Sequence, residues 1–556
     1  MFHVERNKFI MNKKSIIKGK VVDVVARRIY NGELFLENGR IKQIREIEEE
    51  CDRYILPGLV DSHVHIESSM LVPSSFARAA VASGTVATVS DPHEIANVLG
   101  LEGVRYMIKN GKRSLFKFYF GAPSCVPATS FETSGAVIDS DAIKHLMGNP
   151  DIYYLAEMMN FPGVIYGDTE VLKKIKYAHD VGKPIDGHAP GLDGDSLEKY
   201  AKSGITTDHE CTTVEEAVQK IEKGIKIQIR EGSAAKDFEN LFPLLMTHPR
   251  DVMFCTDDCH PDDLLKGHIN KVMARAVAKG ANVFDVIAAA SKNPVEHYGL
   301  DVGMLQVEDC ADFVEVNNLS DFSVLRTYIN GELVYSDGEV LLEKITENPI
   351  NNFNCSPISV DDIKLIDEGR KIQTIVVNDG DLLTGKEIVK PTVCNGEIVC
   401  DVDRDLLKIV VVNRYRKAKP QVGFVKNFQL KRGAIAGSIA HDSHNIIAIG
   451  TTDKDIVDAI NRVIENEGGI VALDGFEVED LKLNVAGLMS TGEAAEIAGK
   501  YHKVHSMSKE MGSQLTAPFM TMAFMALLVI PELKIGDKGL FDVSKFEFTS
   551  LNVDNE

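Results

Sequence analysis

Near its start the chain carries the stretch Leu56-Pro57-Gly58-Leu59-Val60-Asp61-Ser62-His63-Val64-His65. An apolar run that ends in polar residues is typical of a buried parallel strand whose end reaches an active site. Residues i and i+2 of a strand face the same side, so His63 and His65 present two imidazoles together. Neutral imidazole is the commonest side-chain ligand of divalent metals. The stretch therefore predicts a barrel strand that ends in half of a metal site.

Residues 57–315 repeat this alternation of strand and helix. Apolar runs at 85–89, 152–156 and 252–255 alternate with helical stretches at 171–181, 196–203 and 213–223. Such alternation indicates βαβ units and a parallel sheet, and about 260 residues is the size of a TIM (β/α)8 barrel. A doubly wound open sheet is the competing architecture, but no Gly-rich dinucleotide loop opens a helix. We expect an α/β fold with a TIM barrel over 57–315.

The two flanks of this region differ from it. Short apolar runs are separated by Asn31-Gly32, Asn38-Gly39 and Asn330-Gly331. Asn-Gly between apolar runs indicates a hairpin turn, so 1–56 and 316–355 are expected to form one small β-domain. Residues 356–556 mix strand-like runs at 375–377, 409–412 and 446–449 with a helical stretch at 455–467. They predict a C-terminal α+β domain.

Composition excludes some partners. Of 556 residues, 82 are acidic and 61 basic, which gives a formal net charge of −21. This argues against a nucleic-acid backbone or an anionic membrane surface as partner. The longest apolar run, 519–530, is too short to span a bilayer, and residues 1–6 lack a signal-peptide segment. With nine scattered cysteines, these features predict a cytoplasmic protein.

Most strand-like runs of the middle region end in His, Asp or Glu. Alone, each such residue would more often be an ordinary surface or hydrogen-bonded group. The carboxyl ends of barrel strands meet at one face, so together they indicate a single site. The candidates are Asp91, His93, Glu94, Glu157, His188, His209, Glu210, Asp257 and Asp258.

Several motifs carry a family resemblance. The segment 57–65 resembles the first-strand signature of the amidohydrolase superfamily. Two longer motifs are specific to a smaller group of proteins within that superfamily. They are His63-Val64-His65-Ile66-Glu67-Ser68-Ser69-Met70 and Asp91-Pro92-His93-Glu94-Ile95-Ala96-Asn97-Val98. With 187–191, 208–210, 230–235, 255–258, 486–490 and 529–534, they resemble the adenine deaminase family over nearly the whole chain.

This resemblance implies a binuclear divalent metal site in a TIM barrel. Two histidine pairs would each hold one metal: His63 with His65, and His188 with His209. Glu157, after the fourth strand, would bridge them where many amidohydrolases carry a carboxylated lysine, and Asp257 would complete the site. Ligands without thiolate suit Mn, Fe, Zn or Co, and the resemblance favours Mn or Fe.

The implied reaction is hydrolytic deamination of adenine to hypoxanthine and ammonia by a metal-activated hydroxide, in purine salvage. Asp257 is the expected proton shuttle, while Asp258 should face the opposite side of the strand end. The acid that protonates the purine ring nitrogen stays open among Glu210, Glu231 and Glu94.

Other residues are expected nearby. Arg230, Glu231 and Ser233 would contact the purine edge, although a plain charged loop fits almost equally well. Asp91, His93 and Glu94 would form an outer shell that orients a ligand, or a further metal position. His441 and His444 are candidates for a capping contact from the C-terminal domain.

Two alternatives to adenine deamination remain. One is another amidohydrolase reaction, on a different aminopurine or a cyclic amide. The other is a non-catalytic barrel scaffold, but that would be marked by a lost metal ligand, and every assigned ligand is present. The His-x-Glu…Pro-Cys-x-x-Cys pattern of zinc nucleobase deaminases is incomplete here, because no Pro-Cys-x-x-Cys occurs. The expected assembly is a homo-oligomer, with a dimer as the guess.

Overall fold

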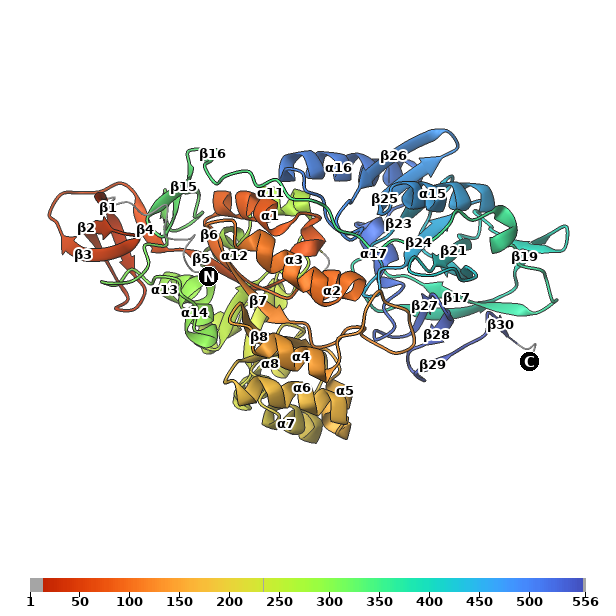
Figure 1. Cartoon of the computed structure of the whole chain (residues 1–556), viewed down its shortest axis with the longest axis horizontal. Coiled ribbons are helices and arrows are strands. Elements are labelled where there is room, and N and C mark those ends of the chain that lie inside the picture. Colours follow the sequence, from red (N-terminus) through yellow and green to blue (C-terminus); the bar gives the residue numbers. More distant parts are fainter. Residues whose placement is uncertain (1–13, 234, 554–556) are drawn as a thin grey trace.

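A barrel of parallel strands forms the centre of the molecule (Figure 1). The computed structural model describes residues 14–233 and 235–553, so residues 1–6 and Ala234 of the 230–235 motif lie outside the described part. One sheet holds β5 (Leu59–Val64), β6 (Thr85–Ser90), β7 (Lys117–Ala122), β8 (Ile152–Met158) and β9 (Ile185–Gly187). A second holds β10 (Thr207–Asp208), β11 (Lys226–Arg230) and β12 (Val252–Cys255).

Backbone contacts at two seams close these sheets into one barrel. At one seam Thr206 N–H donates to Ile185 O at 3.0 Å. At the other, Val64 and Asp257 form a parallel bridge between β5 and β12. The described strands of the barrel are buried along nearly their whole length, as parallel strands covered by helices must be.

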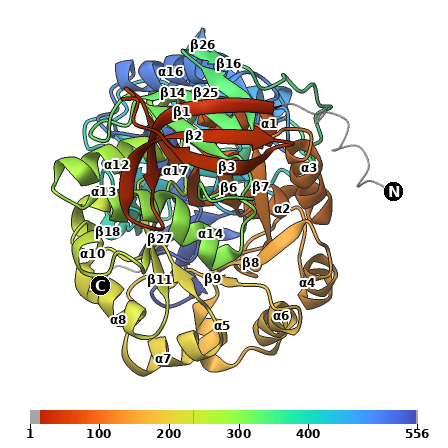
Figure 2. The same ribbon diagram turned by 90° about the vertical axis from the view of Figure 1, so that its left-hand side faces the viewer.

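Helices follow the strands and surround the barrel (Figure 2). They include α1 (Pro73–Ala80), α2 (His93–Leu99), α3 (Leu101–Gly111), α4 (Ser140–Met147), α6 (Thr169–Asp180), α7 (Gly194–Lys202), α8 (Val214–Glu222), α11 (Pro261–Lys266) and α12 (Ile269–Ala278). The helices expected at 171–181, 196–203 and 213–223 are α6, α7 and α8, each within two residues. The predicted TIM barrel is confirmed, and the doubly wound sheet is excluded.

The small β-domain is one sheet built from both sides of the barrel. Its strand order is β16-β15-β14-β13-β4-β1-β2-β3. The bounds are β1 (Lys14–Asp23), β2 (Arg28–Glu37), β3 (Arg40–Glu46), β4 (Tyr54–Pro57), β13 (Phe313–Val316), β14 (Val324–Ile329), β15 (Glu332–Ser336) and β16 (Glu339–Val340). Strand β13 thus begins a few residues before position 316, where the sequence had placed the boundary.

One of the three predicted Asn-Gly turns is wrong. Asn38-Gly39 and Asn330-Gly331 do connect strands, and all four residues have positive φ. Asn31 and Gly32, however, lie inside β2, where they pair with Lys20 and Gly19 of β1. Pairing along the length of two ten-residue strands overrides the local turn preference of this dipeptide.

The C-terminal domain is an α+β unit, as predicted. Its main sheet has the order β18-β17-β22-β21-β24-β23-β25-β26, with β30 (Asn552–Val553) beside β17. The strands are β17 (Lys371–Val376), β18 (Gly385–Val389), β21 (Leu407–Val412), β22 (Gln421–Lys426), β23 (Ala434–Gly437), β24 (Ile446–Gly450), β25 (Gly469–Asp474) and β26 (Glu477–Lys482). Helix α15 (Asp453–Glu465) packs on this sheet, two residues earlier than expected.

The rest of this domain faces the barrel. It comprises α16 (Ala494–Glu510), α17 (Pro518–Phe524) and a small sheet of β27 (Leu533–Gly536), β28 (Gly539–Asp542) and β29 (Glu547–Phe548). Val72 N–H, in the loop after β5, donates to Ser490 O at 3.2 Å, and Ser490 N–H donates to Met70 O at 2.8 Å. The domain therefore covers loops that follow barrel strands. Among the described residues, no helix is both long and apolar enough for a membrane span.

Candidate active site

The first barrel strand and the last one bring three ligand-type side chains together. His63 and His65, at the end of β5, approach each other with 3.3 Å between their Nε2 atoms. Asp257, just after β12, places Oδ1 3.1 Å from Nε2 of His65 and 3.7 Å from Nε2 of His63. All three side chains are buried. Because β5 and β12 meet at the barrel seam, closure of the barrel builds this group.

Glu157 links that group to a second pair of histidines. It lies on β8, the fourth barrel strand, and its Oε1 is 3.2 Å from Nε2 of His65. Its Oε2 is 2.7 Å from Nδ1 of His188 and 3.3 Å from Nε2 of His209. Burial disfavours the charge of this carboxylate, but the facing histidines, His188 foremost, hold the pKa of Glu157 well below its usual range. One carboxylate therefore lies between the two predicted histidine pairs.

The donor set and its spacing fit divalent metal ions. Two ligands of one such ion, each about 2.1 Å from it, lie roughly 3.0–3.5 Å apart at tetrahedral or octahedral angles. The separations of 3.1 to 3.7 Å among His63, His65 and Asp257 are of this size. Nδ1 of His63 and Nδ1 of His209 are buried without a hydrogen-bond partner. Burying several carboxylates costs free energy unless they are paired with positive charge, so this set of side chains favours bound cations.

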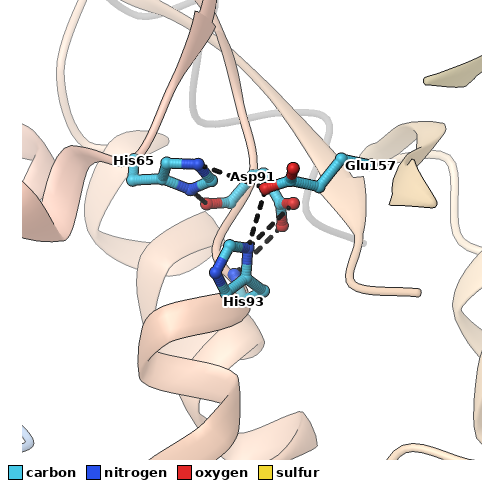
Figure 3. Close-up of side chains that lie close together, drawn as sticks. All are labelled: His65, Asp91, His93 and Glu157. Atoms are coloured by element: carbon cyan, nitrogen blue, oxygen red, sulfur yellow. Dashed lines mark hydrogen bonds and ion pairs between the residues drawn. The ribbon is translucent and has the colours of Figure 1, made fainter. Parts of the chain in front are cut away.

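Asp91 and His93 lie closer to the centre than an outer shell requires. In Figure 3 the carboxylate of Glu157 faces both His65 and His93. Nδ1 of His93 is 3.3 Å from Oε1 of Glu157 and 3.1 Å from Oδ2 of Asp91. Since both residues follow β6, the second barrel strand contributes to the same buried group.

A buried arginine lies beside these groups. Arg230, at the end of β11, places Nη1 3.0 Å from Oδ2 of Asp257 and Nε 3.1 Å from Asp237. It also forms a two-point ion pair with Glu210. Burial opposes the charge of Glu210, but Arg230 and the nearby histidines lower its pKa. Glu210 Oε1 lies 3.5 Å from Nε2 of His209, so this carboxylate borders the second histidine pair.

Three residues proposed from the sequence are directed elsewhere. Glu231 forms an ion pair with Arg275 of α12, so it does not reach the histidines. Ser233 donates its hydroxyl to Asp263 at 2.7 Å and builds the loop. Asp258 accepts a hydrogen bond from the hydroxyl of Ser68. In each case the loop after the strand, rather than the strand itself, decides the direction of the side chain.

Asp61 is a supporting residue that the sequence reasoning missed. It is fully buried on β5 and accepts hydrogen bonds from both N–H and the hydroxyl of Thr256. Its Oδ2 also lies 3.0 Å from Nε2 of His268. These contacts fix the residue next to Asp257. The one available signal was a buried-type strand position occupied by an acid, directly before the two histidines.

The C-terminal domain adds a second histidine cluster. Glu94 at the start of α2 lies 2.8 Å from Nδ1 of His441 and contacts Nε2 of His444. The capping contact expected for these two histidines is therefore made on Glu94. Its composition would suit a metal, yet Ala440 N–H donates to Nδ1 of His444 at 3.3 Å. That bond leaves Nε2 as the protonated nitrogen of a neutral ring, so this cluster is a hydrogen-bonded one.

Known proteins resemble this chain along its whole length. A model of the amidohydrolase family matches residues 54–334, and one of the adenine deaminase C-terminal domain matches residues 381–547. The adenine deaminase of Methanosarcina mazei is 54% identical over 551 residues, with 96% of this chain and 99% of that protein covered. That of Methanosarcina acetivorans is 55% identical over 544 residues, with 96% and 98% covered. That of Sulfurovum sp. is 52% identical over 535 residues, with 96% and 98% covered.

The agreement of these matches with the geometry settles the family. The amidohydrolase match spans the barrel together with β4, β13 and β14 of the small β-domain, and the second match spans most of the C-terminal domain. The two Methanosarcina relatives are more than 50% identical to this chain over almost the whole length of both proteins. This chain belongs to the adenine deaminase family of the amidohydrolases.

Proposed function

We propose that this protein deaminates adenine hydrolytically to hypoxanthine and ammonia, a reaction of purine salvage. The observation that carries the proposal is the Glu157 carboxylate between two histidine pairs at the carboxyl end of the barrel. Relatives that share about half of all residues over the full length are named adenine deaminases.

The metal ligands in this proposal are those that surround Glu157. His63 and His65 would hold one divalent ion, His188 and His209 the other, with Glu157 between them and Asp257 at the first. Bound there, divalent ions would lower the pKa of a water molecule towards about 7 and so supply the nucleophile. Among Mn, Fe, Zn and Co, which all accept such ligands, Mn or Fe is our proposal.

Asp257 is proposed as the proton shuttle. Its Oδ1 faces the two histidines of β5, while its Oδ2 is held by Arg230 at 3.0 Å. Burial disfavours its charge, but His63, His65 and Arg230 hold the pKa of this carboxyl well below its usual range. It therefore begins the cycle unprotonated and ready to accept the proton of the attacking water. It would then pass that proton to the departing amine.

Glu210 is our candidate for protonating the purine ring nitrogen. Of the three acids considered, Glu231 is paired with Arg275, and Glu94 is held between His441 and His444. Glu210 remains at the edge of the histidine group, oriented by Arg230. Its lowered pKa means that it must first accept a proton before it can donate one.

Purified protein tests the function directly. We expect turnover of adenine, poor turnover of adenosine, and two transition-metal ions per chain after preparation with Mn. A double variant, His63→Ala with His65→Ala, should lose metal and activity but remain folded. Full activity in that variant would end the proposal. Turnover of guanine or a dihydropyrimidine without adenine would favour the alternative amidohydrolase reaction.

The cellular location and the oligomeric state are two further predictions. The acidic composition and nine free cysteines support a cytoplasmic location. A homodimer is expected, and light scattering of the purified chain would test it.

A further inference from the structure

Lys220 is a fully buried lysine on α8, in contact with the loops that carry the second histidine pair. Its Nζ donates to Ala189 O at 2.7 Å and to Oε1 of Glu216 at 2.8 Å. The same nitrogen lies 3.2 Å from Oδ2 of Asp208. Because a buried ammonium group loses its hydration, lysine is almost never fully buried unless such partners compensate it.

The carboxylate of Asp208, at the end of β10, joins the same two loops. Asp208 is fully buried. Its Oδ2 accepts from Ala189 N–H at 3.0 Å, and its Oδ1 accepts from Glu210 N–H at 2.8 Å. Ala189 directly follows His188 in the chain, and Glu210 directly follows His209. One carboxylate therefore fixes the backbone beside both histidines of the second pair.

Glu216, one helical turn before Lys220, strengthens this connection. Its Oε1 accepts from Gly191 N–H at 2.9 Å, and its Oε2 accepts from Thr212 N–H at 3.4 Å. Gly191 belongs to the loop after β9, and Thr212 belongs to the loop after β10. Both loops are therefore attached to a single turn of α8.

The buried charges of Lys220 and Asp208 depend on each other. Burial opposes the charge of both groups. Their mutual attraction nevertheless holds the pKa of Lys220 above its ordinary value and the pKa of Asp208 below its ordinary value. Removing one partner of such a pair leaves a buried charge uncompensated, which is far more costly than replacing both partners by neutral groups. Loss of Lys220 should therefore release the backbone that Asp208 holds.

The first metal position is held by a different part of the fold. Asp257 N–H donates to His63 O at 3.0 Å, and His65 N–H donates to Asp257 O at 3.1 Å, across the seam of the barrel. In the described part of the chain, the side-chain hydrogen bonds and ion pairs of Lys220 and Asp208 all go to residues between 189 and 220. A change at Lys220 should therefore leave the first position unaltered.

We propose that Lys220 is a positioning residue for the second metal position, acting through Asp208 on the backbone beside the two histidines. This inference rests on the proposed function, in which His188 and His209 bind one of two divalent ions. It extends to the proposed acid Glu210, because Asp208 also holds the N–H of that residue. Helix α8 thus orients one half of the site, while the barrel seam orients the other half.

Calorimetric titration of the metal-free protein with Mn provides the first test. The parent protein should bind two ions. In Lys220→Met one ion should bind as it does in the parent protein, and the other about 10- to 100-fold more weakly, which is the usual effect of losing a group that orients a metal ligand. Parent-like affinity for both ions, or equal weakening of both, would overturn the inference.

Lys408→Met is the matched control, because Lys408 is another buried lysine paired with an aspartate. Its Nζ donates to Oδ1 and Oδ2 of Asp453 at 2.7 and 2.8 Å, within the C-terminal domain. This variant should lose stability but bind both ions with parent-like affinity. If it weakens one ion as strongly as Lys220→Met does, the effect is a general loss of stability, and the positioning role is refuted.

A double variant, Lys220→Met with Asp208→Asn, decides the case where Lys220→Met does not fold. It removes both charges, so no unpaired carboxylate stays buried. The single oxygen of asparagine can accept from Glu210 N–H, but its amide nitrogen cannot accept from Ala189 N–H. We expect a parent-like circular dichroism spectrum and weaker binding of one ion. Parent-like binding of both ions by this variant would contradict the proposal.

Adenine turnover by the parent protein keeps this inference separate from the proposed function. The metal titration needs no substrate. A parent protein that binds two ions without deaminating adenine would refute the function, while its comparison with Lys220→Met would still decide the positioning role. A parent protein that binds fewer than two ions would refute both.

Discussion

At the scale of single residues, Asp257 combines an unusual backbone conformation with a carboxylate that faces the histidines. Its φ is +55°, a conformation that is uncommon outside glycine and that costs of order 1–3 kcal/mol. Its N–H donates to His63 O at 3.0 Å, and its carbonyl accepts from His65 N–H at 3.1 Å. These bonds hold the unusual backbone in place, and the turn it makes directs the carboxylate towards the histidines. Strain of this kind concentrates at functional sites.

Asp257→Asn should lower kcat by about 10²–10⁴, the usual scale of general acid–base catalysis. Asparagine keeps the shape, one acceptor oxygen and a tolerance for positive φ, but it cannot cycle a proton. The Asp257→Asn variant should therefore keep most of its bound metal and most of its free energy of unfolding. Asp258→Asn should be less harmful, because that side chain contacts Ser68 instead. The check is kcat of both variants at matched metal content, and a crippled Asp258→Asn with a normal Asp257→Asn would reassign the shuttle.

Lys534 predicts a pH dependence of stability. It is fully buried on β27, where Nζ donates to Leu382 O at 2.9 Å and to Phe524 O at 3.1 Å, and burial lowers its pKa to about 7. In the unfolded chain a lysine titrates near about 10.4, so between these values the unfolded state binds the extra proton. Stability should therefore rise with pH from about 7 to about 10 relative to Lys534→Met. Urea unfolding of both proteins at pH 7 and 9 measures this, and a stability difference that does not grow with pH would contradict it.

Sequence alone indicated most of the histidine group but not its orientation. His63, His65, Glu157, His188 and His209 end strands, and strand ends converge in any barrel. Residues in the following loops were less predictable, because loop geometry is set by local turns and distant contacts. Glu231 and Ser233 are directed to Arg275 and Asp263 for that reason. The contact of His93 with Glu157 joins two strands, and no spacing along the chain reveals it.

At the scale of elements, Gly58 explains how β4 of the small β-domain can lead directly into β5, the first strand of the barrel. A Cβ at this position would lie 2.4 Å from Cγ2 and 2.7 Å from Cγ1 of Val86 on β6. The glycine therefore allows close approach of β6 where the small β-domain joins the barrel. Valine is stiff at χ1 and fully buried here, so it cannot move aside.

Gly58→Ala should destabilise the protein by about 1–3 kcal/mol through overpacking. Val86→Ala removes both clashing methyl groups, so the double variant should lose less stability than the two single losses combined. Gly499→Ala on α16 is the control, since its Cβ meets nothing within 4 Å. Helix propensity predicts a gain of about 0.5–1 kcal/mol there. Equal effects at positions 58 and 499 in urea unfolding would refute the packing argument.

The Asn-Gly pairs mark the limit of local signals for elements. Asn330-Gly331 turns between two short strands and adopts the positive φ values that the dipeptide favours. Asn31-Gly32 has the same composition but lies opposite Lys20 and Gly19 in a long strand pair. Which of two such pairs becomes a turn depends on the partner strand. The local sequence therefore predicted the β-domain and two of its turns, but not the register of β1 and β2.

At the scale of the whole molecule, the domains are joined at the site itself. Tyr501 of α16 hydrogen-bonds His260 of the loop after β12 at 2.9 Å, and His441 and His444 contact Glu94. The partners in these contacts are separated by hundreds of residues. The sequence predicted three domains, but their arrangement follows from such long-range pairs. For that reason Glu94 could not have been predicted as the partner of His441 and His444.

Metal removal should affect both activity and global stability. A chelator would leave Glu157 and Asp257 buried among histidines without their cations, and ligand binding stabilises only the folded state. At a metal concentration of 100 Kd the loss is about 2.7 kcal/mol, or roughly 5–10 °C in Tm for a domain of this size. Calorimetry with and without chelator measures the shift, and far-UV circular dichroism should stay constant. Return of Mn should restore Tm, whereas an unaltered Tm after complete metal loss would argue against a buried metal site.

The seam between β5 and β12 also has a consequence for how the protein is made. His63 and His65 belong to the first barrel strand, and Asp257 follows the last. At a synthesis rate of about 5–20 residues per second, Asp257 is translated roughly 10–40 s after the two histidines. Glu157, His188 and His209 are translated within that interval, so Asp257 is the last of the proposed metal ligands to be made. We therefore expect the proposed site of His63, His65 and Asp257 to be complete only once the first and last strands of the barrel have met.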